Sequence, residues 1–346
     1  RIGFRAIMAP FFLTWGIYFL LLSFRKLGSA KNRLLPLLAG TIYGLGFYSY
    51  IAYRATPILI LAIMILSWLK NKNIKRHILF ASLCFIFASI ITVLPLLNYF
   101  IKNPADFFGR TAQISIFNSP TLVKDLGLNI LKTAAMFNFA GDYNWRHNIA
   151  GRPLLFWPVG ILFLIGLFLS VKNFRKNFIL LGWLIVAALP VVISNEGMPH
   201  ALRAIIMAPP IFILAAWGGV KLYDWFLNRN VAKKFLLAAT SSLLAFLVVE
   251  SYWSYFLFWG KNQEVKNAFS ENYLEIGRLV NSLPKNATKY VTVPPGGVTV
   301  RGVPMAAQTV MFITDTFLPE KQKEKNIYYI NSKNGSLPPG GFVFNL

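Results

Sequence analysis

The sequence predicts an all-α polytopic membrane protein that ends in a small α/β module. Hydrophobic residues make up 56% of the 346-residue chain and charged residues only 14%, with a mean hydropathy of +0.54. Soluble domains have roughly 45–50% apolar and about 25% charged residues. The apolar residues gather in long runs, and Lys and Arg gather in the short stretches between those runs. The last part of the chain lacks such runs.

About eight apolar runs are candidates for membrane spans, because a helix needs about 20 mostly apolar residues to cross a bilayer core of about 30 Å. Lipid offers the backbone no hydrogen bonds, so each run is expected to be helical. The third run is short, and the last contains one acid, Glu250. The runs are residues 6–24, 34–53, 55–69, 78–101, 153–171, 178–194, 204–220 and 235–258.

The positions of the basic residues predict how these spans are oriented. Alternate connections, the first, third, fifth and seventh, are rich in Lys and Arg, which favours the cytoplasmic side for them. The opposite side then holds Arg54, the long loop 102–152, the loop 195–203 and the chain from residue 259 onward. This pattern predicts a multi-pass membrane protein whose C-terminal tail is extracytoplasmic.

The chain therefore divides into a transmembrane domain, residues 1–258, and an extracytoplasmic tail, residues 259–346. In the tail, residues 271–283 have the spacing of an amphipathic helix. Three strand-like runs follow at 290–293, 310–314 and 327–330, separated by turns rich in Gly and Pro. We expect a small α/β module there.

Composition and missing motifs exclude several classes of function. The net charge is +23, but the basic residues lie in loops between spans, which indicates affinity for anionic membrane lipid and not for nucleic acid. A single cysteine, Cys84, allows no disulfide within the chain. The sequence contains no P-loop, Rossmann fingerprint, GxSxG or HExxH motif. No cofactor is identified, and the isolated acids Asp142 and Glu196 give a divalent metal no support.

Two outer loops carry the polar residues that are candidates for chemistry. The long loop contains Asp142, Arg146 and His147 directly before a span. A solvated loop with a turn and a helix cap is the alternative explanation for this polar stretch.

The second outer loop carries Glu196, His200 and Arg203 hard against the next span. Arg and His together suit a phosphate, because the guanidinium fork matches its oxygens and imidazole donates a further hydrogen bond. The alternative is that Arg203 reaches the lipid interface while Glu196 caps a helix.

Arg54 is a further candidate, since it is a positive charge on the predicted outer side between two spans with almost no loop. Such charges near a span are costly and tend to be functional. A lipid phosphate at the outer interface explains it, and so does an Arg that reaches headgroups from a helix end. Arg5 lies outside the first span and is a weaker candidate for the same site. For Glu250 an interfacial position among aromatic residues is favoured.

Three stretches resemble bacterial membrane glycosyltransferases of the dolichyl-phosphate-mannose–protein mannosyltransferase type, glycosyltransferase family 39 and its relatives. They are residues 1–7, residues 141–148 leading into Pro153 and Leu154, and residues 199–203 running toward Pro209. The resemblance covers about residues 1–260. It implies the C-type (GT-C) fold, a polyprenyl-phosphate sugar donor and inverting transfer at the outer surface of the bacterial plasma membrane.

The resemblance also implies roles for individual residues. In such enzymes the catalytic base is an Asp or Glu in the first outer loop. This chain begins at Arg1 without an initiator Met, and we expect that base in a segment preceding it. By analogy Arg54, His200, Arg203 and Glu196 are expected to bind the donor phosphate. Asp142, Arg146, His147 and Arg5 are expected to shape the outer cavity.

The expected partners are a polyprenyl-phosphate-linked sugar, membrane lipid and an acceptor that is a protein, a lipid or a glycan. Two other functions fit a polytopic protein. A transporter or flippase for a lipid or polar solute predicts charges deep in the spans and symmetric halves. A structural protein whose tail binds a partner predicts no cluster of His and Arg at the outer surface.

Overall fold

The computed structural model describes residues 5–25, 34–113, 115–195, 197–294, 299–300, 303–331 and 340–346. The chain forms two compact units, Arg1–Ala245 and Phe246–Leu346. The boundary between them falls inside helix α10 (Lys233–Tyr252). The sequence predicts the boundary further along the chain, at residue 258.

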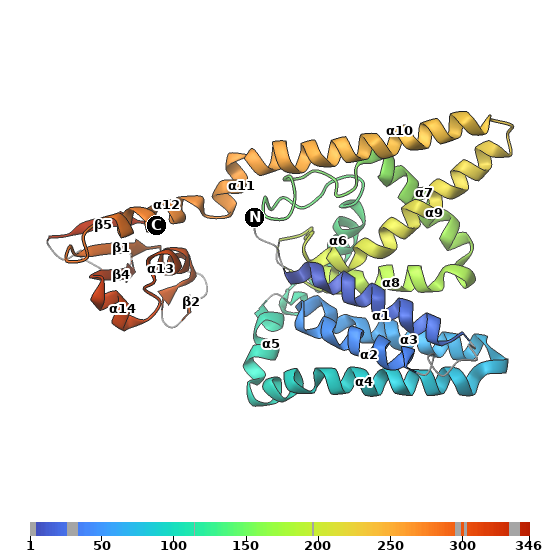
Figure 1. Cartoon of the computed structure of the whole chain (residues 1–346), viewed down its shortest axis with the longest axis horizontal. Helices are drawn as coiled ribbons and strands as arrows, with labels where there is room; N and C mark the ends of the chain where they lie inside the picture. Colours follow the sequence, from blue (N-terminus) through green and yellow to red (C-terminus); the bar gives the residue numbers. More distant parts are fainter. Residues whose placement is uncertain are drawn as a thin grey trace. The chain divides into compact units, whose positions relative to one another are not determined.

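The first unit is built of helices (Figure 1). The turns η1, η4, η5 and η7 lead directly into the helices that follow them, and η3 continues α2. The elements are η1 Arg5–Ile7, α1 Met8–Ser23, α2 Leu35–Leu45, η3 Gly46–Tyr48, η4 Ile51–Ala55, α3 Thr56–Lys70, η5 Lys72–Ile74, α4 Lys75–Lys102, α5 Pro104–Gln113, η6 Ile116–Asn118, α6 Leu122–Ala135, α7 Trp157–Lys172, α8 Phe174–Val192, η7 Arg203–Met207 and α9 Ala208–Leu227.

Within the described residues, six helices are long and apolar enough to cross a membrane. They are Arg5–Ser23, Ile51–Lys70, Lys72–Lys102, Phe174–Val192, Arg203–Leu227 and Lys233–Trp259. Large apolar side chains on them stay exposed, among them Phe87 at 62% and Ile185 at 64%. Exposed apolar surface on this scale is typical of helices that contact lipid.

The prediction of eight spans is not confirmed, because two of the predicted runs form shorter helices, Leu35–Tyr48 and Trp157–Lys172. The first ends early because Tyr50 adopts an extended backbone. The second begins late because residues 153–156 are not helical, and Leu154 and Leu155 donate backbone hydrogen bonds to Met136 and Phe137 instead. At about 1.5 Å per residue, the 16 residues of α7 extend about 24 Å.

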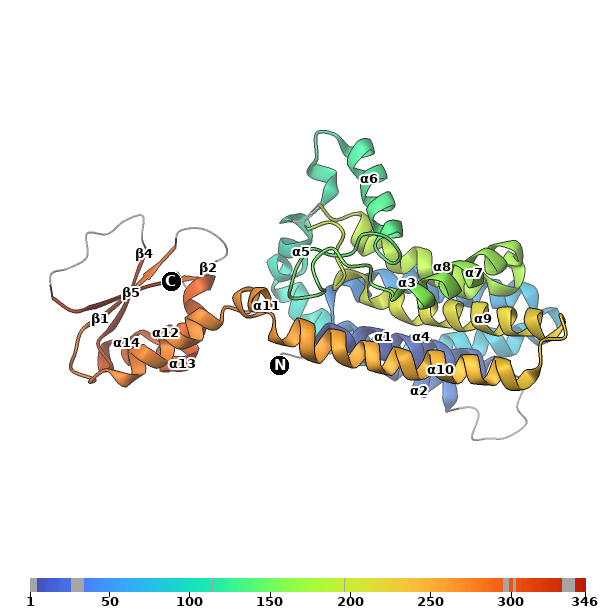
Figure 2. The ribbon, with the colours of Figure 1, turned by 90° about the horizontal axis from the view of Figure 1, so that it is seen from above.

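Glycines let the helices of this bundle approach closely. A Cβ at Gly166 of α7 would lie 1.9 Å from the carbonyl oxygen of Leu214 in α9, and one at Gly218 of α9 would lie 2.0 Å from that of Leu162. Gly40 of α2 makes the same kind of contact with Phe85 of α4. Small residues at helix crossings are the usual means of packing helices in lipid. The helices α1, α2 and α4 lie side by side in this way (Figures 1 and 2).

The second unit contains a parallel three-stranded sheet in the order β4-β1-β5. Val280 of α12 and Val310 of α13 pack with Val291 and Ile327 in its core. The unit's elements are the end of α10, the π-helical turn η8 Trp253–Trp259, α11 Gln263–Ala268, α12 Glu271–Ser282, β1 Lys289–Val293, β2 Thr299–Val300, β3 Val303–Pro304, η9 Met305–Ala307, α13 Gln308–Thr314, α14 Pro319–Glu324, β4 Ile327–Asn331 and β5 Phe342–Asn345.

The predicted helix at 271–283 and the predicted strands at 290–293 and 327–330 are confirmed as α12, β1 and β4. The predicted strand at 310–314 is wrong, since these residues belong to helix α13. Val310, Met311 and Thr314 are its buried residues, a helical spacing that a short apolar run does not distinguish from a strand. Strand β5, near the end of the chain, was not predicted.

Candidate functional site

Three connections of the first unit meet around one cavity of about 610 Å³. They are the turn after η3, the loop between α6 and α7, and the loop between α8 and η7. These are the second, fourth and sixth connections between the predicted spans, so the three meet at one end of the bundle, as their alternation predicts. The cavity is lined by Tyr50, Ile51, Asp142, Tyr143, Asn144, Arg146, His147, Gly197, Met198, Pro199, His200, Leu202 and Arg203. Its volume falls within the range of small-molecule sites, about 300–1,000 Å³.

The loop between α6 and α7 is closed by its own backbone. Gly141 donates to the carbonyl of Gly151, and Gly151 donates back to that of Asp142, each at 3.1 Å. A Cβ at Gly141 would lie 1.9 Å from the carbonyl oxygen of Arg152, and Gly151 has a φ of +75°, which favours glycine. Both glycines are therefore needed to form this closed loop.

Asp142 is the centre of the site. Its side chain is 4% exposed, and three donors contact its carboxylate. His147 Nδ1 and the backbone N–H of Ala201 lie 3.0 Å and 2.8 Å from Oδ2, and the N–H of Asn144 lies 2.8 Å from Oδ1. Burial raises the pKa of Asp142, but the hydrogen bonds from His147, Asn144 and Ala201 outweigh it, so the pKa lies below the ordinary value. The carboxylate is thus held ionised.

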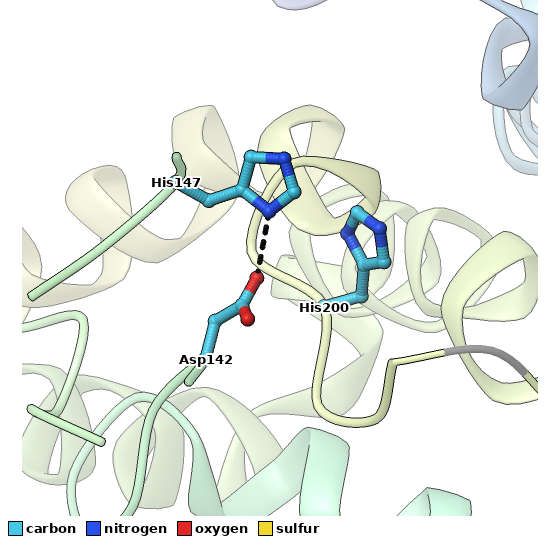
Figure 3. A group of neighbouring side chains, drawn as sticks. All are labelled: Asp142, His147 and His200. Atoms are coloured by element: carbon cyan, nitrogen blue, oxygen red, sulfur yellow. Dashed lines mark hydrogen bonds and ion pairs between the residues drawn. The ribbon is translucent and has the colours of Figure 1, made fainter. Parts of the chain in front are cut away.

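The bond to Ala201 joins two loops that are far apart in the sequence. It brings His147 and His200 together, with ring centroids 4.8 Å apart and planes inclined by 30°. Figure 3 shows Asp142, His147 and His200 as one group. One ligand atom from each lies within 4.8 Å of the others. In the sequence Asp142 has no ligand residues at a metal-binding spacing, so the sequence alone gives no support for a metal. In the fold two imidazoles lie beside Asp142.

Arg203 is buried at the start of η7, with 6% of its surface exposed. Its guanidinium donates to the hydroxyl of Ser194, and its backbone N–H lies 3.4 Å from His200 Nδ1. The indole of Trp183 holds the same turn by donating to the carbonyl of Ile206 at 3.0 Å. Arg203 is therefore fixed in place on the cavity wall.

The helix α6 supports the loop that carries Arg203. The buried side-chain amide of Asn129 donates to the carbonyls of Val192 and Ser194, at 3.0 and 2.8 Å. Ile116 adds a backbone bond to Ile193. Two parts of the predicted outer loop 102–152, α6 and the turn η6, thus form part of the framework of the site.

The structure brings together five of the predicted site residues and leaves two apart. Asp142, Arg146, His147, His200 and Arg203 line the cavity, whereas Arg54 and Arg5 are not among its lining residues. Glu196 lies outside the described residues.

Arg54 packs against aromatic rings. Its guanidinium lies 4.1 Å from the ring centroid of Phe107 and 5.0 Å from that of Phe100. Its Nη1 donates to the carbonyl of Phe107 at 2.8 Å. These contacts attach α5 to η4. Arg5 is exposed at the start of η1.

Sequence reasoning missed Tyr50, Tyr143, Asn144 and Ser194. The first three line the cavity, and Ser194 binds Arg203. The residue types at 142 and 144 could have indicated tight turns, because Asp and Asn side chains often accept the backbone N–H of the residue two positions further along the chain. Asn144 repeats the pattern by accepting the N–H of Arg146 at 3.0 Å.

No family model, curated protein or solved structure matches the chain.

Proposed function

We propose that the protein is a glycosyltransferase of the bacterial plasma membrane that moves a sugar from a polyprenyl-phosphate carrier to an acceptor on the outer face. In this proposal it has the C-type (GT-C) fold, with the two shorter apolar helices completing eight spans. The observation that carries the proposal is the cavity at one end of an apolar helical bundle, lined together by Arg146, His200 and Arg203.

The cavity suits the phosphate of a lipid-linked donor. Two guanidinium groups and an imidazole match the oxygens and charge of a phosphate diester. The apolar helices of the bundle suit the polyprenyl chain. A carrier anchored in the bilayer presents its sugar at the membrane surface, so the enzyme needs no nucleotide-binding fold.

The chemistry assigns the two arginines a role in the departure of the leaving group. In the transfer, the bond between the sugar's anomeric carbon and the phosphate oxygen breaks, a bond to the acceptor oxygen forms, and the proton of the acceptor hydroxyl passes to a general base. The phosphate leaves with an additional negative charge. Arg203, held by Ser194, and Arg146 are donors already in place to stabilise that charge.

The basic connections at the other end of the bundle support the proposed orientation. His77, at the start of α4, contacts the carbonyl of Ser23 at the end of α1, at 2.8 Å, so the point where the first connection begins lies beside the point where the third ends. Positive charge in those loops favours the cytoplasmic side for them, and the cavity is then on the outer face.

The test uses the full-length protein in membranes with a panel of radiolabelled polyprenyl-phosphate sugars. We expect label to leave one of the carrier lipids. Arg203→Lys and Arg146→Ala should each slow that loss by at least about ten-fold, because a missing donor to a developing charge typically costs a factor of about 10²–10³. Arg229→Ala is the matched control, since its guanidinium stacks over Trp225 near the end of α9, and neither residue lines the cavity.

Retention of label by every carrier would overturn the proposal. Solute flux in proteoliposomes would then support a transporter, the second function compatible with a polytopic protein. Label loss that is equal in the wild type and in both cavity variants would instead place the reaction elsewhere in the molecule.

A further inference from the structure

We propose that Asp142, His147 and His200 bind one divalent transition-metal ion, of the kind represented by Zn²⁺, in the cavity. One ligand atom from each of the three residues lies within 4.8 Å of the others. They come from two loops that the Asp142–Ala201 hydrogen bond joins. This inference stands on the geometry of the three side chains and does not depend on the proposed sugar transfer.

The donor set selects the class of metal. Two imidazoles and one carboxylate are the three protein ligands of one class of four-coordinate Zn²⁺ site, in which the fourth position is open to water or substrate. Ca²⁺ and Mg²⁺ prefer a shell of oxygens, which two imidazoles do not supply. The nitrogen-rich set therefore favours Zn²⁺, Co²⁺ or another late first-row ion.

The distances require only a small movement. Ligands 2.0–2.2 Å from a tetrahedral Zn²⁺ are roughly 3.3 Å apart, and His147 Nδ1 and Asp142 Oδ2 already lie 3.0 Å apart. An ion between them replaces their hydrogen bond. The ligand atoms lie within 4.8 Å of one another, so His200 must approach by up to about 1.5 Å to reach that spacing. It follows Gly197, whose φ of +63° marks a turn in the loop.

The surroundings of the three residues resemble a supported metal site. Metal ligands are usually held by outer hydrogen bonds that fix their orientation. Asp142 receives such bonds from the backbone N–H groups of Asn144 and Ala201, both at 2.8 Å. These two donors remain with the carboxylate when the bond to His147 gives way to an ion.

The neighbouring charges specify what the metal-loaded site would bind. Arg146 and Arg203 line the same cavity, so an ion with an open coordination position would share it with two guanidinium groups. That combination favours an anionic oxygen ligand such as a phosphate. A metal-free pair, with His147 hydrogen-bonded to Asp142 and His200 packed beside it, is the competing arrangement.

The experiment measures metal binding by the full chain in detergent, without substrate. Metal is removed from the protein with a chelator, the protein is dialysed and titrated with Zn²⁺, and the bound metal is quantified by inductively coupled plasma mass spectrometry. Co²⁺ is titrated in parallel, because its visible absorption reports four-coordinate geometry. We expect one ion per chain.

Histidine variants locate the ion. His147→Ala and His200→Ala should each weaken Zn²⁺ binding by at least about ten-fold, since changes even in the outer shell of a metal site cost roughly 10–100-fold. His77→Ala is the matched control: it is the third of the three histidines in the chain, and it contacts Ser23, outside the cavity. Its affinity for Zn²⁺ should equal that of the wild type.

Failure to retain metal in the wild type, or undiminished binding in the His147→Ala, His200→Ala double variant, would overturn the proposal. If the variants do not fold, X-ray absorption of the Zn²⁺-loaded wild type decides the matter. Two imidazole ligands are expected there, and none or one would contradict the site. Sugar transfer plays no part in any of these readouts, so this test and the test of the proposed function fail independently.

Discussion

Replacing Asp142 by Asn tests whether one carboxylate holds the two cavity loops together. The carboxylate accepts from His147, Asn144 and Ala201 at 3.0, 2.8 and 2.8 Å. An amide has one acceptor oxygen. If that oxygen keeps His147 and Ala201, the new NH₂ group faces the N–H of Asn144, and this partly buried donor loses its partner.

The magnitude follows from these three bonds. An unsatisfied buried donor costs about 1–3 kcal/mol, and the partly buried N–H of Asn144 lies at the lower end of that range. Each remaining bond weakens by roughly 1 kcal/mol when its acceptor loses its charge. Because such terms are not fully additive, we expect local opening of the loops to become easier by about 3 kcal/mol. At 1.4 kcal/mol per factor of ten, this is roughly a hundred-fold.

Amide hydrogen exchange reads this change at the affected groups. In Asp142→Asn the N–H groups of Asn144 and Ala201 should exchange about a hundred-fold faster, because both are protected by the carboxylate. Asp224→Asn is the matched control, since that carboxylate is half exposed and 3.6 Å from Lys221, a pair worth at most about 1 kcal/mol. Unchanged exchange at Asn144 and Ala201 in Asp142→Asn would refute the assignment of Asp142 as the junction.

Three further predictions concern pH, support and packing. The pKa of Asp142 is lowered, so its stabilising contribution is complete above the ordinary Asp pKa of about 4 and is lost as pH falls through its folded-state pKa. The melting temperatures of the wild type and Asp142→Asn should therefore converge in acid, and a difference in melting temperature that stays constant with pH would contradict this. Asn129→Leu removes the donor to the carbonyls of Val192 and Ser194 and should destabilise the loop before Arg203 by about 1–3 kcal/mol. Amide hydrogen exchange at residues 193–203 should become faster, and unaltered exchange would contradict the supporting role of Asn129. Gly166→Leu should lower the melting temperature of the first unit, because even a Cβ would lie 1.9 Å from the carbonyl oxygen of Leu214; Gly127→Leu, where a Cβ has open space, should leave it nearly unchanged, and equal melting of the two variants would contradict the packing.

The helical character of the chain was predictable because long apolar runs are typical of membrane-spanning helices. The exact lengths were not. Tyr50 and the stretch before Trp157 read as continuous with apolar runs, yet their backbones leave the helix to make other bonds. The same ambiguity of short apolar runs placed a strand where α13 lies.

The residue types of the candidate site and the loops that carry them were predictable, but the grouping of these residues was not. Asp142 and Ala201 are 59 residues apart, and nothing local in the sequence indicates that they meet. Arg54 and Arg203 look equivalent as outer charges beside a span, yet Arg54 is stacked on Phe107 while Arg203 lines the cavity. Tertiary contacts distinguish them, and these are set by packing that the periodicity of one segment does not contain.

The most direct measurement is a cryo-EM structure of the full-length protein with a non-transferable phosphonate analogue of the polyprenyl-phosphate sugar that it turns over. The account predicts phosphonate density within hydrogen-bonding distance of Arg203 and Arg146, with the sugar in the cavity beside His200. Density for the analogue at another surface of the molecule, with this cavity unchanged, would contradict it.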